Sequence, residues 1–581
     1  MRSAHSMLFA RIPALAGLLR HAVRAAAVGA LAGLSSLAAA GPDLGQVVSR
    51  MPITVDFVAA IDNGAALRKD LHGSPLMLAI STMRRPAAVI DAWTALAGDL
   101  GMTDAEAFDL LLGQRVIIVG SELQADDEGQ PRWAILSELD PETERRLRTT
   151  LKAVPRRIVA GQPVLEFEHG SFLLATSSGR LRCTPAGTFD NTPASSIMLL
   201  APASDRELFE QMLPLLRCSN PERTLLDLPA GRMVESWQTR DALVVWRLPD
   251  PLGSPNRFIG ATFGADPAGW RIEAMAYPAD GWTSDLDIST IARWSPALLG
   301  TLPPGAALAM MGSREAVHEA RGWIDPLLRT SLPDPRGESF DRLLGRRSML
   351  AVWLREQSSD GTPALQEPEV LLAMDTPDLA RLALRADAFM EEQLLANAAT
   401  PLDHESLPTT APNARQTAVP LALSDVRSLT FTEVDQAASS SPPVLSWTYV
   451  PEAEAHRNTA SDGWWVMHYL PDGQSAETVS PTTTTPALQE LGALPARNYL
   501  HVGCAMPSVW SMRIRQQLVD TLATQDDDDA AINGSVGVLA LNEIVFSHVR
   551  SASWAVWHAR DDNLLRAEVR LELGDNHPLP E

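Results

Sequence analysis

The stretch EAFDLLLGQRVIIV at residues 106–119 recurs as ESFDRLLGRRSMLAV at residues 338–352. In the first copy Phe108, Leu111 and Leu112 lie at helical spacing, and Gly113 stands where a helix C-cap is expected. The apolar run that follows in each copy suits a buried strand. Because so long a pattern occurs twice, we interpret the two stretches as copies of one structural unit.

The sequence upstream of each copy extends the duplication. Residues 75–96 match residues 304–328, with Trp93 aligned to Trp323. In the first copy, residues 76–80 are an apolar run of strand length, and the residues after Pro86 have the spacing of an amphipathic helix. Each copy is therefore expected to begin with a strand and a helix.

The sequence downstream matches as well, since residues 133–147 align with residues 369–382. Asp140-Pro141 and Thr376-Pro377 each place an N-cap residue before a proline at the first helical position. Each copy is therefore expected to continue with two strands and a helix. A third, partial copy is indicated because residues 297–313 resemble residues 487–508.

The order of these elements predicts the fold class and the domains. We expect an α+β fold with repeated strand-helix-helix-strand-strand-helix modules and mostly antiparallel sheet, separated by β-rich stretches. The expected domains are a signal peptide at 1–40, a first α+β module at 41–285, a second module that repeats it at 286–486, and a partial third module with C-terminal strands at 487–581.

Composition excludes several classes of protein. The 581 residues are 45% hydrophobic and 20% charged, which is typical of a globular chain and excludes both wholesale disorder and a polytopic membrane protein. The formal net charge is −23. Such an acidic chain is not attracted to nucleic-acid phosphates, so no nucleic-acid partner is expected.

The N-terminus has the pattern of an export signal. Residues 1–40 contain four arginines and no acidic residue, and the uncharged run 25–40 ends in Ala38-Ala39-Ala40. This pattern predicts a secretory signal peptide and an extracytoplasmic, periplasmic or secreted protein. An uncleaved N-terminal anchor and a buried helix are the alternatives, although the run is short for a membrane span. No later segment is a candidate span.

Cysteines and known motifs point to no metal or cofactor. Cys183 and Cys218 could pair, but buried free thiols are the preferred interpretation of these and of Cys504. No zinc-ligand spacing is present, and we interpret Asp526–Asp529 as a solvated loop in preference to a calcium site. Nucleophile-elbow, phosphate-loop and dinucleotide motifs are missing, so catalytic residues stay unknown.

Three further features have both a functional and a structural interpretation. A basic cluster could bind anions, but a solvated helix face is preferred; it comprises Arg145, Arg146, Arg148, Lys152, Arg156 and Arg157. Trp464 and Trp465 should point to opposite faces of a strand, one in the core and one exposed. Stacking on a carbohydrate or an apolar ligand is the functional interpretation, and core filling with one exposed neighbour is preferred. His468 and His558 lie in β-rich stretches and could meet in space.

The repeated unit, the Leu-Pro-then-strand openings and the closing RAEVRLEL of residues 566–573 together resemble a family of large exported bacterial proteins that carry a domain of unknown function. The resemblance implies envelope localisation and carries no catalytic residues. The function expected is a non-enzymatic binding or scaffolding role in the envelope, with an unknown envelope protein or ligand as partner. The alternative is a periplasmic hydrolase whose site is assembled from residues distant in sequence.

Overall fold

The structure is a computed structural model in which the chain forms two compact units. Unit 1 contains Met1–Trp282 with Asn563–Glu568, and unit 2 contains Thr283–Asp562 with Val569–Glu581. The residues described lie between 44 and 573. Their larger gaps are 67–93, 122–131, 248–257, 278–290, 322–339, 400–414, 431–443, 452–462, 471–485 and 516–548, and shorter gaps lie between these.

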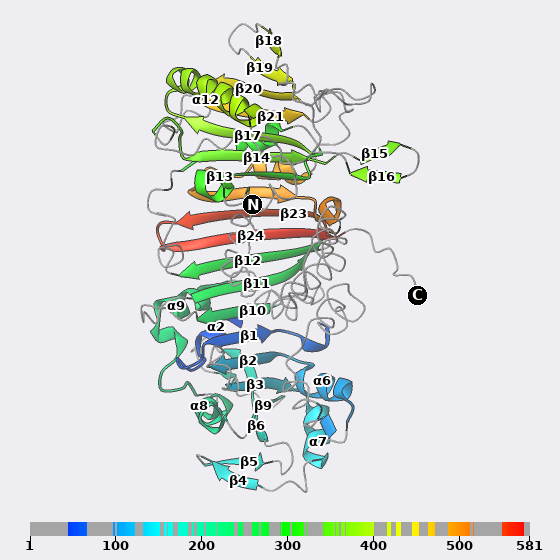
Figure 1. The fold of residues 1–581 in the computed structure, drawn as a ribbon. Helices are drawn as coiled ribbons and strands as arrows, with labels where there is room; N and C mark the ends of the chain where they lie inside the picture. Colours follow the sequence, from blue (N-terminus) through cyan, green and yellow to red (C-terminus); the bar gives the residue numbers. More distant parts are fainter. Residues whose placement is uncertain are drawn as a thin grey trace. The chain divides into compact units, whose positions relative to one another are not determined.

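Unit 1 is built on an antiparallel sheet (Figure 1). Its strands, in hydrogen-bonding order, are β12 (Gly269–Tyr277), β11 (Phe258–Asp266), β10 (Ala242–Arg247), β1 (Phe57–Ile61), β2 (Val116–Ser121), β3 (Arg132–Leu139), β9 (Ser196–Pro202), β6 (Phe172–Ser178), β5 (Gln162–Glu166) and β4 (Arg156–Val159). A separate pair consists of β7 (Arg180–Cys183) and β8 (Phe189–Asp190). The helices are α2 (Leu44–Ser49), α6 (Asp104–Leu112), α7 (Pro141–Thr150), α8 (Arg206–Leu216), η3 (Leu225–Asp227) and α9 (Pro229–Ser236).

Unit 2 is also built on an antiparallel sheet. Its strands, in hydrogen-bonding order, are β23 (Val549–Ala559), β22 (Tyr499–Ala505), β13 (Leu308–Ser313), β14 (Arg347–Trp353), β17 (Glu369–Thr376), β21 (Gly463–Leu470), β20 (Val444–Pro451), β19 (Val426–Thr430) and β18 (Arg415–Val419). A separate hairpin consists of β15 (Glu356–Ser359) and β16 (Thr362–Leu365). The helices are η6 (Ala297–Thr301), α12 (Leu379–Ala399) and α13 (Pro486–Gly492). The last strand of the chain, β24 (Leu564–Leu573), has its first five residues in unit 1 and the others in unit 2.

The predicted fold class is wrong. The described elements are mostly antiparallel strands with few and mostly short helices, and they do not form repeated strand-helix-helix-strand-strand-helix modules. The sequence interpretation treated the β-rich stretches as separators between modules. In the structure β5, β6, β9 and β10 are strands of the same sheet as β2 and β3. Pairing between distant segments extends the sheet, and helix-spacing patterns cannot reveal it.

What the two units share is the order of strands in the sheet. In unit 1 the order from β1 to β4 is β1-β2-β3-β9-β6-β5-β4, and in unit 2 the order from β13 to β18 is β13-β14-β17-β21-β20-β19-β18. When the strands of each set are numbered along the chain, both sets lie in the sheet in the same order, so each strand of unit 1 has a counterpart in unit 2. The strand that corresponds to β13 is therefore β1, and not residues 76–80, which lie outside the described residues.

The segment 487–581, expected as a partial third module, belongs to unit 2 except for Asn563–Glu568, which belong to unit 1. Its strand β22 pairs with β13 along Leu308–Gly312, and β23 pairs with β22 in turn. These two strands stand where β10 and β11 stand beside β1 in unit 1.

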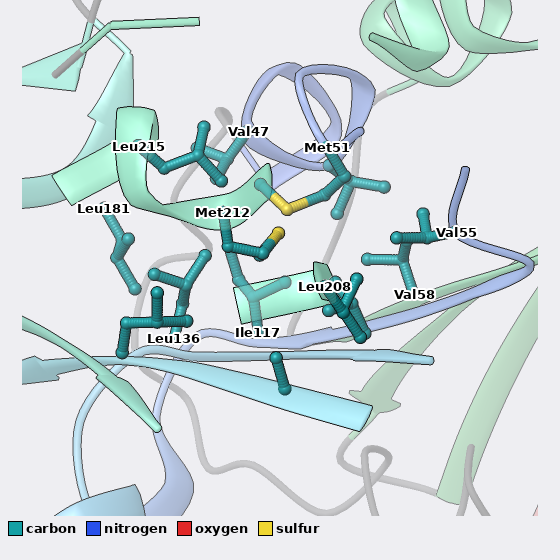
Figure 2. Packing of buried hydrophobic residues seen from close by; sticks show 14 of the residues in the cluster. Val47, Met51, Val55, Val58, Ile117, Leu136, Leu181, Leu208, Met212 and Leu215 are labelled. Carbon is teal, nitrogen blue, oxygen red and sulfur yellow. The ribbon is translucent and has the colours of Figure 1, made fainter. Parts of the chain in front are cut away.

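Apolar side chains cover both faces of the unit 1 sheet. On one face, Val47 of α2, Met51 just after it, and Leu208 and Met212 of α8 pack over Ile117 of β2 (Figure 2). The opposite face is covered by α6 and α7, which contribute Leu111, Leu112 and Leu147. Because both faces are buried, the strands read as continuous apolar runs, such as SIMLLAP in β9, without the alternation of a one-sided sheet.

Unit 2 has the same two-sided arrangement. Phe340, Leu382 and Met390 pack on the face of Leu350 and Leu372. Leu299 of η6 and Leu488 of α13 pack on the other face. Among the residues described in either unit, no helix combines the length and the apolar character needed to cross a bilayer.

Candidate functional site

The arginine of the repeated Gly-x-Arg sequence makes a buried ion pair in both units. In unit 1, Arg115 donates from Nε to Oδ1 of Asp62 at 2.7 Å and from Nη1 to the carbonyl of Leu181 at 2.8 Å. Asp62 directly follows β1, so the contact ties β2 to its neighbouring strand. The sequence analysis did not identify Asp62 as the partner of this arginine.

In unit 2, Arg347 pairs with Asp375 of β17. Its Nε donates to Oδ2 at 2.8 Å, its backbone N–H donates to Oδ1 at 2.9 Å, and both side chains are 7% exposed. A Cβ at Gly345 would collide with this carboxylate, which explains the glycine of Gly-x-Arg. A contact made in both units at the start of a central strand has a structural role.

The other residues of the repeated helix have different surroundings in the two copies. Phe340 is buried in unit 2, whereas Phe108 is half-buried at the edge of its cluster. Asp109 is exposed on α6, whereas a catalytic carboxylate would need a cleft and a second polar partner at reacting distance. Asp341, Trp93 and Trp323 lie outside the residues whose side chains are described.

The basic cluster is part of a solvated helix with its own counter-ions. Arg145 pairs with Glu142 at 3.6 Å and Arg148 with Glu144 at 2.5 Å, at the i,i+3 and i,i+4 spacings of α7. Surface pairs of this kind contribute little to stability. The structure therefore supports the solvated-face interpretation, and the acidic run at 526–529 lies outside the described residues.

Trp464 and Trp465 point to opposite faces of β21, as predicted, but neither is exposed. Trp464 is 3% exposed in one core cluster and Trp465 is fully buried in the other. The expectation of one exposed indole is wrong, because both faces of the unit 2 sheet are covered. Trp447 is also buried and donates from Nε1 to Oδ1 of Asp387 on α12 at 3.0 Å.

His468 does not meet His558. In the order of the sheet β21 is separated from β23 by β17, β14, β13 and β22, which at ~4.8 Å per strand spacing places the two histidines at least ~24 Å apart. His468 instead lies 2.7 Å from Oε1 of Glu369 through its Nε2. Glu369 is 1% exposed, and Trp353, directly opposite it on β14, has its ring centroid 6.4 Å from that of the histidine.

The duplicated strand order allows a position-by-position comparison of this region with unit 1. Aligning Val116 with Ser348 and following the strand registers across each sheet gives the corresponding residues. Trp464, Val466 and His468 of β21 correspond to Ile197, Leu199 and Ala201 of β9, and Ser446 and Thr448 of β20 correspond to Leu173 and Ala175 of β6. Five apolar residues in unit 1 thus correspond to a set in unit 2 of which three are polar.

The helices that follow the corresponding strands β9 and β21 differ between the units, and in unit 2 the next described helix is α13, whose Leu488 lies in one core cluster with Trp353 and Trp464. In unit 1, α8 follows β9 and packs its buried Leu208, Phe209 and Met212 on this face. In unit 2 the corresponding segment is 471–485, which reads PDGQSAETVSPTTTT and contains no Leu, Met, Ile or Phe.

We call the region the polar face of unit 2 and define it by Trp353, Glu369, Thr448, Trp464 and His468. It is more open than its counterpart in unit 1, since Thr448 and His468 are half-buried and Val450 beside them is 43% exposed. Ile197, Leu199 and Ala201 in unit 1 are all fully buried.

Three hydrogen-bonding atoms of the polar face are buried without a partner among the described residues. They are Nε1 of Trp353, Nε1 of Trp464 and Oγ1 of Thr448. A buried donor without an acceptor costs ~1–3 kcal/mol, so such groups are rare and call for an explanation. On β14, β20 and β21 they lie around the hydrogen-bonded pair of Glu369 and His468.

Two titratable residues of β22, His501 and Cys504, belong to the core. Burial lowers the pKa of His501 to about 4, and Nδ1 of this neutral ring accepts a hydrogen bond from Nε1 of Trp554 at 3.0 Å. Burial raises the pKa of the Cys504 thiol to about 12, which makes it unreactive. Cys504 is free, as expected, while the side chains of Cys183 and Cys218 lie outside the described residues.

Sequence reasoning identified His468, Trp464 and the β-rich stretches but not the polar face. Its members lie on four strands, and His468 is separated from Glu369 by 99 positions. The available signal was a glutamate and a histidine within apolar strands, EVLLAM and WWVMHYL. No group of three or more potential metal ligands occurs among the described side chains. Comparison of the chain with protein-family models, with curated proteins and with solved structures gave no match.

Proposed function

We propose that the protein is an exported envelope protein with a non-enzymatic binding or scaffolding role, and that the polar face of unit 2 is its binding site. The observation that carries the proposal is the difference between the two units. At corresponding positions unit 1 has an apolar surface under α8, and unit 2 has half-buried polar side chains and buried donors without partners.

The two units share a buried arginine ion pair but differ at the polar face. The buried arginine ion pair occurs in both units and stabilises both sheets. The polar face occurs in unit 2 alone among the described residues and costs stability there, because polar groups are buried without compensation. A cost of this kind is accepted where a ligand supplies the missing hydrogen bonds.

Hydrogen–deuterium exchange tests the proposal without knowledge of the ligand. The purified protein is incubated separately with polysaccharide, peptide and lipid fractions of the envelope. We expect one fraction to slow exchange in β20 and β21, while β6 and β9, the matched strands of unit 1, are unchanged. If no fraction protects β20 and β21, the proposed binding site is wrong.

A periplasmic hydrolase is the second candidate, and one observation favours it. Glu369 holds the imidazole of His468, and Ser446 is the residue opposite His468 in the register of β20 and β21. A carboxylate, a histidine and a serine are the residue types of hydrolytic triads. Turnover of a panel of ester, glycoside and peptide substrates that is lost in both His468→Ala and Ser446→Ala would establish this function in place of the binding role.

A further inference from the structure

We infer that three arginines at one end of the unit 2 sheet form a second binding site, for a phosphate group. They are Arg293, Arg497 and Arg560, and we call them the arginine cluster. All three are exposed, so a ligand reaches them from solvent without entering the core. The inference is independent of the polar face, because none of the three belongs to it.

Backbone hydrogen bonds bring the three arginines together from distant parts of the chain. The segment of Arg293 pairs with that of Arg497, which exchanges two backbone hydrogen bonds with Trp294, at 2.9 and 3.1 Å. On its other side the segment of Arg497 pairs with the end of β23, where the backbone N–H of His558 donates to the residue after Arg497 at 2.9 Å. Paired segments lie ~4.8 Å apart, so Arg497 stands between Arg293 and Arg560.

Backbone carbonyls and an aromatic ring hold the guanidinium groups in place. Nε of Arg293 donates at 3.0 Å to the carbonyl of the residue before Arg497. Nη2 of Arg560 donates at 2.6 Å to the carbonyl of Ile291, so this side chain reaches across the middle segment. The guanidinium carbon of Arg497 lies 5.2 Å from the ring centroid of Trp557. Side chains held in this way lose less freedom when a ligand binds.

Most N–H donors of the arginine cluster are available to a ligand. A guanidinium has five N–H groups and no acceptor, and the contacts above use one N–H of Arg293 and one of Arg560. The described contacts of the cluster are with carbonyls and an aromatic ring, and not with carboxylates. By contrast, Arg145, Arg148 and Arg206 on the helices of unit 1 each pair with a glutamate.

The local charge favours an anion although the chain as a whole is acidic. The formal net charge is −23, but the field of distant carboxylates is screened beyond ~8 Å at physiological ionic strength. Asp561 and Asp562 follow Arg560 in an exposed turn. Two carboxylates surrounded by water weaken the attraction of three guanidinium groups for an anion without cancelling it.

Three guanidinium groups match a phosphate better than a carboxylate. A carboxylate has two oxygens, and a single arginine can occupy both in a bidentate pair. A phosphate monoester has three terminal oxygens and a charge of about −1.5 to −2 at pH 7, so each arginine can donate to a different oxygen. Soluble phosphate compounds and lipid headgroups both carry this group, and the experiment distinguishes the two sources.

The test is calorimetric titration of the full chain with inorganic phosphate and with glycerol 3-phosphate, with acetate as the carboxylate comparison. Phosphatidylcholine vesicles that contain phosphatidic acid present the same group on a lipid surface, and pure phosphatidylcholine vesicles are their control. We expect a phosphate probe to bind and acetate not to bind. Binding of the soluble probes alone identifies a soluble phosphate compound as the ligand, binding of the vesicles alone identifies a headgroup, and either result supports the inference.

Variants assign the binding to the arginine cluster. Arg497→Ala removes charged hydrogen bonds and should weaken binding about tenfold, and Arg560→Ala should have a similar effect. Arg497→Lys keeps the charge but loses the planar fork, so it should weaken binding less than Arg497→Ala. The matched control is Arg206→Ala, which removes the same charge from an exposed arginine already paired with Glu210 at 2.8 Å.

Thermal unfolding establishes that every variant is folded, and Arg206→Ala should bind as the unchanged protein does. The inference is overturned if no phosphate probe binds, if acetate binds as tightly as phosphate, or if binding is unchanged in Arg497→Ala and Arg560→Ala. Equal weakening in Arg206→Ala would also overturn it, because the effect would then come from net charge alone.

Discussion

At the scale of single residues, the Arg347–Asp375 pair shows how much one buried contact can contribute. Arg347→Ala leaves the carboxylate of Asp375 buried without its partner, which should cost about 3–5 kcal/mol in the free energy of unfolding. Arg342→Ala, at an exposed neighbouring position, should change it by less than about 0.5 kcal/mol. Urea unfolding of both variants measures the difference, and equal small effects would contradict the structural role.

The two phenylalanines of the repeat should differ in their energetic contribution. Phe340 is 2% exposed and packs against Phe389 and Trp465, so Phe340→Ala should cost about 3–5 kcal/mol. Phe108 is half-buried, and Phe108→Ala should cost clearly less because part of its surface is already in water. Urea unfolding measures both costs, and an equal loss of unfolding free energy in the two variants would contradict the difference in burial.

His501 gives stability a dependence on pH with a definite sign. Burial lowers its pKa from the usual 6.5 to about 4, so the folded chain binds fewer protons than the unfolded chain between these values. The stabilisation is complete above pH ~6.5 and is lost as the pH falls toward about 4.

His501→Gln is the variant that tests this dependence, because its side-chain oxygen can still accept from Trp554 without taking up a proton. Thermal unfolding midpoints measured from pH 8 to pH 4 should fall less steeply in the variant than in the unchanged protein. A slope that is identical in the two proteins would assign the acid sensitivity to other groups.

At the scale of elements, α7 begins where the sequence predicted and for the predicted reason. Oδ1 of Asp140 accepts hydrogen bonds from the backbone N–H groups of Glu142 and Thr143, both at 2.8 Å, and Pro141 is the first helical residue. Burial raises the pKa of Asp140, but these hydrogen bonds outweigh it and the pKa is lowered.

Removing this cap should destabilise the first unit modestly. Asp140→Ala should cost about 1 kcal/mol, and Asp140→Asn less, because the amide oxygen can still accept from the same N–H groups. Because the pKa of Asp140 is lowered, its contribution is present above the usual range of an aspartate and is lost as the pH falls. Unfolding at pH 7 and pH 3 measures both effects, and a cost that is the same at the two values would contradict the cap.

The helix α6 illustrates a local sequence signal that was partly recognised. Gly113 ends the helix as expected, with φ −73°, so the position does not require a left-handed backbone. At the other end Thr103 and Glu106 form a capping box, in which each side chain accepts from the backbone N–H of the other. Thr103-x-x-Glu106 is readable from sequence and strengthens the boundary of this element.

At the scale of the whole molecule, the predicted export is open to a direct measurement. The pattern of residues 1–40 predicts cleavage after Ala40, so the mature protein should begin near Gly41. Mass spectrometry of the N-terminal peptide from the envelope fraction gives the answer. A mature protein that retains Met1 or Met7 would refute cleavage and support the N-terminal anchor.

The duplication explains why one half of the molecule can serve as the control for the other. Corresponding positions are defined by strand register, so a substitution in unit 2 has a matched position in unit 1. A residue that matters only for the fold should give similar effects in both units. A residue of the binding site should affect ligand binding in unit 2 alone.

Several features were determined by the sequence alone. The apolar runs of β2 and β3, the start of α7 at Asp140-Pro141 and the opposite directions of Trp464 and Trp465 all follow from interactions between neighbours along the chain. The repeat was also visible, because the Gly-x-Arg sequence recurs, and its arginine makes a buried ion pair in both copies.

The tertiary structure decided the rest, because strand pairing joins segments that are distant in sequence. Only the register shows that β1 is the counterpart of β13, that β9 and β21 are equivalent, and that both faces of each sheet are covered. The polar face depends on the same pairing, since Trp353, Glu369 and His468 come from three strands. Periodicity reports whether a residue is buried, whereas its partner across the sheet is set by long-range pairing that local sequence does not encode.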